Sequence, residues 1–173
     1  MTNLSFALAG QLASCLNKLE KIITITSEEI WKMGDPPFWQ IVFHIINSLD
    51  NYFATFNPAI SDPEREYSLP DNLTRYAEFG FFDNKREDLE KTCISKDVLL
   101  EFLNSTRQRM RVYFNQDIEK QFDQPSGFSW IPFTKYELIL HNLRHIAEHN
   151  GVLDQRLKAA GSEYVGWLGR GEI

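Results

Sequence analysis

The sequence predicts an all-α protein, a four-helix bundle, on two observations. Four long stretches repeat apolar residues every three or four positions, which is the spacing of one helix face. No stretch alternates apolar and polar residues as a half-buried strand does. A length of 173 residues with 43% hydrophobic residues suits a single domain with its own core. We therefore expect residues 1–173 to form one helical-bundle domain, because helices with one apolar stripe bury it against one another.

The first two long helices are expected over residues 5–23 and 38–55. In the first helix the apolar face consists of Leu8, Leu12, Cys15, Leu16, Leu19 and Ile22. Between the helices, Ser27 is expected to cap a short helix, and Asp35-Pro36-Pro37 starts the second long one, because proline is tolerated in a first turn. The second helix places His44 among its apolar residues, which are Phe38, Ile41, Val42, Ile45, Ile46, Leu49, Tyr52 and Phe53.

The stretch from Asn57 to Thr92 is expected to be long and irregular. It contains three prolines, many charges and several aromatic residues. A short helix is expected near residues 73–79. A connection of this length inside one domain is often functional, so we expect it to form a lid over a site.

The third and fourth long helices have clear start signals. Ser95 is expected to cap the third helix, whose apolar residues continue to Phe114. Breakers then occupy residues 123–132. Thr134 and Glu137 form a capping box, in which each side chain accepts the other residue's free backbone N–H. The fourth helix is expected to stop at Gly161.

Charge and cysteine content exclude several function classes. The net charge is -6 and no cluster of Lys and Arg stands out, so we expect no nucleic-acid partner. No apolar run approaches the ~20 residues that span a bilayer, so we expect no membrane association. Two cysteines, Cys15 and Cys93, are too few for a disulfide framework. They are expected to be buried or half-buried fillers in a cytoplasmic protein.

Histidines form the main functional pattern. Three of the four in the chain, His141, His145 and His149, lie four residues apart on one expected helix. Residues at i and i+4 share a helix face, whereas His141 and His149 are about 12 Å apart along the axis and cannot bind one ion together. The pair is therefore either His141 with His145 or His145 with His149. A third imidazole from His44 would complete a three-histidine site with an open position, which is typical of catalytic metals. The alternative is a bundle of hydrogen-bonded histidines without metal.

At these residues the chain resembles the DinB-like superfamily of four-helix-bundle proteins, over nearly its whole length. One half of the pattern is Trp39-Gln40-Ile41-Val42-Phe43-His44-Ile45-Ile46-Asn47. The other half is Arg144-His145-Ile146-Ala147-Glu148-His149-Asn150-Gly151-Val152-Leu153. The resemblance implies an up-down-down-up bundle, with the long irregular segment between its second and third helices. It also implies that His44, His145 and His149 are the metal ligands and that His141 is a neighbour of the site.

The resemblance further implies a function. Related families bind nickel or zinc, often form homodimers, and include transferases and isomerases that use low-molecular-weight thiols. We therefore expect a divalent transition metal, zinc or nickel, in an enzyme that is a thiol-dependent transferase or a hydrolase. Its partners would be a small-molecule substrate, such as a low-molecular-weight thiol, and a second copy of the chain. The alternative is a non-catalytic helical-bundle dimer with a structural or vestigial metal site.

Other polar and aromatic residues are candidates for supporting roles. Asn47 and Ser48 lie one turn beyond His44 and could hydrogen-bond to groups of the site. Glu148 is expected to be a surface carboxylate, and Arg144 is expected to form an ion pair rather than bind substrate. Asp154 could support the site in the same way as Asn47 and Ser48, or it could cap or pair at the surface. The aromatic residues that could line a pocket, or belong to the core instead, are Trp39, Tyr52, Phe79, Phe81, Phe82 and Trp130.

Overall fold

Helices account for nearly all the regular structure that is described. The computed structural model describes residues 3–54, 69–80 and 92–169. Within these ranges the only pairing of strand type is an isolated bridge between Pro125 and Thr134. The elements are α1 (Asn3–Ile25), α2 (Glu28–Trp31), α3 (Phe38–Ala54), the 3-10 helix η1 (Thr74–Gly80), α6 (Lys96–Phe114), the 3-10 helix η2 (Ile118–Gln121) and α7 (Lys135–Ala159). The all-α prediction is confirmed.

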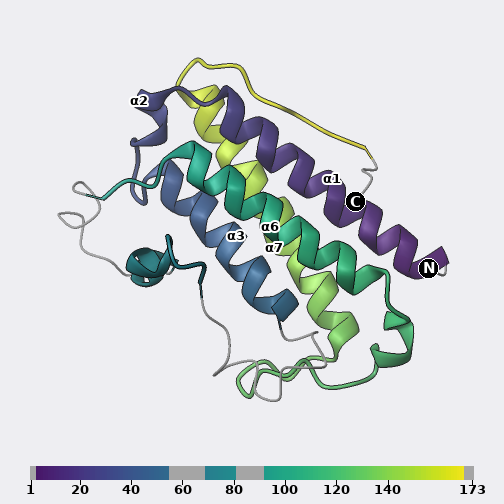
Figure 1. Ribbon diagram of the computed structural model, residues 1–173. Coiled ribbons are helices and arrows are strands. Elements are labelled where there is room, and N and C mark those ends of the chain that lie inside the picture. Colours follow the sequence, from purple (N-terminus) through teal and green to yellow (C-terminus); the bar gives the residue numbers. More distant parts are fainter. Residues whose placement is uncertain (1–2, 55–68, 81–91, 170–173) are drawn as a thin grey trace.

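The four long helices α1, α3, α6 and α7 lie side by side, as Figure 1 shows. Helix α1 packs against α6 and α7, and α3 packs against the same two helices. Their apolar stripes meet in one continuous core, whose fully buried members include Leu16, Phe43, Leu103 and Leu153. In the described ranges, no helix combines the length and the apolar character needed to cross a membrane.

The predicted helix starts are confirmed. The Ser27 hydroxyl accepts the Ile30 N–H at 3.2 Å, and the Ser95 hydroxyl accepts the Val98 N–H at 3.5 Å. Both bonds of the capping box at the start of α7 are present: the Glu137 N–H donates to the Thr134 hydroxyl, and the Thr134 N–H donates to the Glu137 carboxylate. These starts were predictable because a cap depends on residues three positions apart.

The connection between α3 and α6 is only partly described. The short helix expected at residues 73–79 is present as η1, one residue later and with the tighter 3-10 winding. It packs against α3, where the rings of Phe79 and Trp39 meet edge to face at 5.8 Å. The rest of the expected lid, including Phe81 and Phe82, lies outside the described residues. Helix η2 was not predicted.

After α7 the chain returns along α1, as Figure 1 shows for the segment that ends at residue 169. The Val165 N–H donates to the Asp154 carboxylate at 3.1 Å, and the Ser14 hydroxyl donates to the Leu168 carbonyl at 3.2 Å. The same Asp154 carboxylate pairs with Lys18 of α1 at 2.6 Å and is only 6% exposed. Of the roles that the sequence left open, Asp154 thus forms an ion pair, but the pair is buried and not at the surface, because α1 and the returning segment cover it.

Two glycines, one inside α7 and one just after it, give a matched pair of stability predictions. Gly151 lies inside the helix with open space where a Cβ would be, so Gly151→Ala is expected to raise the free energy of unfolding by about 0.5–1 kcal/mol. Gly161 follows the helix end at φ +69°, so Gly161→Ala is expected to lower it by about 1 kcal/mol. Urea unfolding of the metal-free protein measures both. If both substitutions changed the free energy of unfolding in the same direction, this would contradict the placement of Gly151 inside the helix and of Gly161 at a positive φ after it.

Candidate metal centre

Two helices bring three histidines together. His44 lies near the middle of α3, and His145 and His149 lie one turn apart on α7. Because α3 and α7 pack against each other, the inward edge of one helix faces that of the other. All three histidines are partly buried, so their rings are held by the core and still reach its boundary. Of the pairs that the spacing left open, His145 with His149 is the one that meets His44.

The ring nitrogens of these histidines converge. Nε2 of His145 lies 3.0 Å from Nε2 of His44 and 3.0 Å from Nε2 of His149. The three rings are nearly perpendicular to one another, with interplanar angles of 80°, 79° and 85°. One nitrogen from each residue lies within 4.8 Å of the others. Three nitrogen lone pairs can thus be directed at one point between α3 and α7.

This arrangement fits a divalent transition metal. Imidazole nitrogens bind zinc at ~2.0–2.1 Å, so two of them around a tetrahedral ion are about 3.3–3.4 Å apart. The separations of 3.0 Å are shorter by a few tenths of an ångström, so small side-chain rotations suffice to admit an ion. Zinc, nickel, copper and iron all accept imidazole ligands. The group could hold a metal ion, and its composition does not select one metal.

Burial keeps the histidines of α7 neutral, as metal ligands must be. Desolvation lowers the pKa of His145 to about 3, with smaller contributions from the neighbouring His149 and His44. Desolvation also lowers the pKa of His149, again with repulsion from His44. A proton therefore competes weakly for these nitrogens at neutral pH, and their lone pairs remain available.

One nitrogen of the site lacks the support that ligand histidines usually have. Nδ1 of His145 is buried, and it has no hydrogen-bond partner among the described residues. If Nε2 binds a metal, the proton of the neutral ring is on Nδ1, where an acceptor would normally orient it. The orientation of His145 is instead maintained by its ring contacts with His44, His149 and His141.

His141 is a neighbour of the group and not a member of it. Its ring is stacked parallel to that of His145, with an interplanar angle of 9° and centroids 6.0 Å apart. Desolvation lowers the pKa of His141, and the charge of Arg144 lowers it further. An Arg144 nitrogen lies 3.4 Å from Nδ1 of His141, which is a contact with a histidine and not the ion pair that the sequence predicted for Arg144.

Aromatic rings continue outward from His141. Tyr52 meets it edge to face at 5.9 Å, and Phe133 contacts it at 5.7 Å. Phe128 then packs on Tyr52 at 5.3 Å, and Trp130 packs on Phe128 at 5.6 Å. No pattern in the sequence indicated that Phe128 or Phe133 lies near the site. They lie in the irregular stretch before α7, where no periodic pattern indicates which side chains turn inward.

The other candidates have mixed outcomes. Glu148 is exposed, as predicted, and Trp39 is only 1% exposed and belongs to the core. Asn47 and Ser48 are partly buried on α3, one turn beyond His44. Cys15 is partly buried, as predicted, and burial raises the pKa of its thiol, so it is not an activated nucleophile. Cys93 is exposed, so the prediction that it is a buried filler is wrong.

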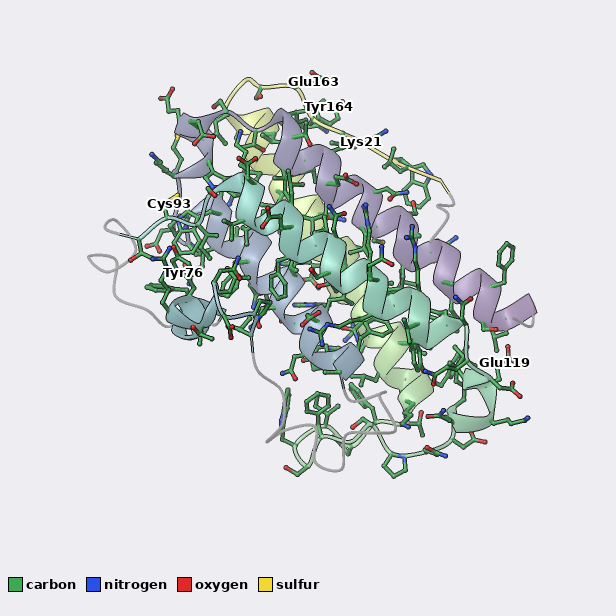
Figure 2. The ribbon with its side chains drawn as sticks, in the orientation of Figure 1. Lys21, Tyr76, Cys93, Glu119, Glu163 and Tyr164 are labelled. Carbon is green, nitrogen blue, oxygen red and sulfur yellow. The ribbon has the colours of Figure 1, made fainter. Side chains whose placement is uncertain are left out.

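A groove of about 740 Å³ lies elsewhere, between α1 and the segment that follows α7. Figure 2 shows Lys21 of α1 near Glu163 and Tyr164 of that segment, all of which line the groove. None of the four histidines lines it. The groove is therefore separate from the candidate metal centre.

The lowered pKa of His145 predicts a pH dependence of stability in the metal-free protein. Below its ordinary pKa of 6.5, the unfolded chain binds a proton at this residue, whereas the folded chain does not until about pH 3. The unfolded state thus binds more protons in this window, so stability falls as the pH is lowered from about 6.5 towards 3. A His145→Gln variant should lose less stability over the same range. Thermal melts of both proteins from pH 7 to pH 4 test this; parallel curves would contradict it.

Comparison with known proteins points to one family. A family model described as the DinB superfamily matches residues 22–153, a range that contains the three converging histidines. Comparisons with curated proteins and with solved structures gave no match.

Proposed function

The chain belongs to the DinB superfamily, and from this premise we propose that it is a metal-dependent enzyme with His44, His145 and His149 as the metal ligands. The observation that carries the proposal is the convergence of three half-buried imidazoles, with Nε2 of His145 lying 3.0 Å from Nε2 of His44 and 3.0 Å from Nε2 of His149. Three protein ligands leave coordination positions open, which is the pattern of catalytic and not of structural zinc sites. Zinc or nickel is the proposed ion.

The proposed reaction is group transfer to a thiol or hydrolysis of a small molecule. A bound divalent ion would lower the pKa of a coordinated water or thiol and polarise a substrate oxygen. The protein's part is to orient the three imidazoles and, by burial, to keep His145 and His149 neutral. Partial burial between α3 and α7 also limits the access of bulk water, which strengthens electrostatic interactions at the site. We assign no general acid or base.

The same premise extends to the topology. We propose that the four long helices form an up-down-down-up bundle within a single domain. The packing of α1 and α3 against the same two helices, α6 and α7, supports this arrangement. Parallel neighbours α3 and α6 would require a long crossover, and residues 55–95 supply a connection of that length between them.

The experiment begins with protein purified without a histidine tag. After the protein is stripped with a chelator and dialysed against zinc or nickel, elemental analysis should find about one ion per chain. Thiol transfer and ester or amide hydrolysis are then compared between the loaded and stripped forms. Activity that appears only with the metal supports the proposal.

Two other outcomes would overturn parts of the proposal. A stoichiometric ion that raises the melting temperature but supports no turnover would favour the non-catalytic bundle with a structural metal. A chain that retains no ion after dialysis would refute the metal site itself.

A further inference from the structure

One side of the three-histidine group is formed by aromatic rings. We define the aromatic wall as Tyr52 of α3, His141 of α7, and Phe128 and Phe133 of the stretch before α7. Each ring contacts another member within 6 Å, at 5.3 Å for Tyr52 with Phe128, 5.9 Å for Tyr52 with His141 and 5.7 Å for Phe133 with His141. Segments distant in sequence thus contribute to one continuous aromatic surface.

The aromatic wall begins at the metal centre itself. His141 is stacked on the ligand His145 with parallel rings 6.0 Å apart. Tyr52 follows His44 by two helical turns on α3, so it lies on the same face about 12 Å further along the axis. A molecule bound at the three histidines and extending towards the side where α3 ends and α7 begins would therefore meet His141 first and Tyr52 beyond it.

The wall lies at the edge of the core: Phe128 is only 6% exposed and belongs to the core, whereas the other three members are less buried. Tyr52, Phe133 and His141 are only partly buried, and Trp130, which packs on Phe128, is 64% exposed. By contrast, Phe43 and Phe102 on the core side of the same bundle are 0% and 2% exposed. The wall consequently retains ring surface that a ligand can cover, next to a group that can hold a metal.

Charge decides which kind of molecule fits. A positive charge lies at the wall, because Arg144 approaches Nδ1 of His141 at 3.4 Å, and a bound metal would add two more charges at the histidines. No wall residue is a carboxylate. A cationic ligand, which aromatic rings alone would attract, is disfavoured here by repulsion, whereas an anionic donor group gains at both positions.

We propose that this site takes small molecules in which an anionic metal-binding group is attached to an aromatic ring, and that Tyr52 and Phe133 recognise that ring. The inference rests on the proposed function, because the metal holds the anionic group. Edge-to-face contacts between aromatic rings stabilise a complex beyond the area they bury, so two such contacts are expected to raise the affinity on the order of tenfold.

The test uses zinc-loaded, untagged protein and three carboxylates: acetate, which has no ring, cyclohexylacetate, which has a saturated ring, and phenylacetate, which has an aromatic ring. Their affinities are measured by ligand-observed NMR titration, and the zinc content of each sample is measured by elemental analysis. Phenylacetate is expected to bind at least about tenfold more tightly than acetate, and more tightly than cyclohexylacetate. Tyr52→Leu and Phe133→Leu should each lose most of the preference for phenylacetate, while zinc content and acetate affinity remain those of the parent.

A matched control is Trp167→Leu, which removes a ring that is 90% exposed on the segment after α7 and lies outside the wall. This variant is expected to have the zinc content and the three carboxylate affinities of the parent. The proposed recognition by the aromatic wall would be overturned if phenylacetate and cyclohexylacetate bound equally tightly. It would also be overturned if both wall variants bound zinc and kept the parent's preference for phenylacetate. Either result would leave the proposed function intact. If the parent protein retained no zinc after loading, the proposed function would be overturned and, with it, this inference.

Discussion

Replacing His145 with alanine is expected to abolish metal binding, with a loss of affinity of more than about 100-fold. Nε2 of His145 lies 3.0 Å from Nε2 of His44 and 3.0 Å from Nε2 of His149. Removing it leaves His44 and His149 as a two-nitrogen site, with the central donor missing. Because even residues that only orient a metal ligand contribute 10–100-fold to affinity, a ligand is expected to contribute more. Competition titrations against a zinc chelator measure the change.

The matched control is His141→Ala, one turn earlier on the same helix. His141 is stacked on His145 but is not among the histidines that could hold the ion. This variant is expected to keep about one ion per chain, with an affinity within about tenfold of the parent. Both variants should retain the helical circular dichroism of the parent, because alanine favours helix. Equal losses in the two variants would refute the assignment of the ligands.

Replacing Phe43 with alanine is expected to lower the free energy of unfolding by about 3–5 kcal/mol. The Phe43 side chain is fully buried, with an exposure of 0%, and its ring packs against that of Phe102 at 6.4 Å. The cost has two parts, the lost transfer of the ring from water and the cavity that the neighbours cannot fill. Against a typical total stability of about 5–15 kcal/mol, this is a large fraction. Urea unfolding of the metal-free protein, followed by circular dichroism, measures it.

Val112 provides the comparison, because it is an apolar residue on α6 that is 63% exposed. Val112→Ala is expected to change stability by no more than about 0.5 kcal/mol. Phe43 also precedes the ligand His44, so its removal should weaken zinc binding through looser placement of α3. A Phe43→Ala protein with the stability of Val112→Ala would mean that the packing around Phe43 is not as described.

Local signals accounted for most of the helical structure. The caps at Ser27, Ser95 and Thr134 depend on residues three positions away, so sequence alone identifies them. The end of α7 is similar, since Gly161 adopts a positive φ and the N–H groups of Gly161 and Ser162 return to carbonyls of the last turn. These features need no knowledge of what packs against the helix.

Side chains whose environment comes from distant segments were harder to predict. For Asp154 the sequence left open a role at the site or a pair at the surface, whereas α1 supplies Lys18 and the returning segment supplies the Val165 N–H around a buried carboxylate. Cys93 was expected to be buried and is exposed. In both cases the burial of a side chain depends on segments far away in the sequence, and periodicity within one helix carries no information about them.

The candidate metal centre was likewise predictable only in part from the sequence. By itself the sequence determined that two histidines share a face of α7 and that a third lies on another apolar helix, because helical spacing dictates which side chains project together. Only tertiary structure decided which pair on α7 meets His44 and that His141 is stacked on His145. The same holds for the ring contacts of Phe128 with Tyr52 and of Phe133 with His141. These relations depend on how α3, α7 and the preceding stretch pack, and distances between separate elements are not encoded in the spacing within any one of them.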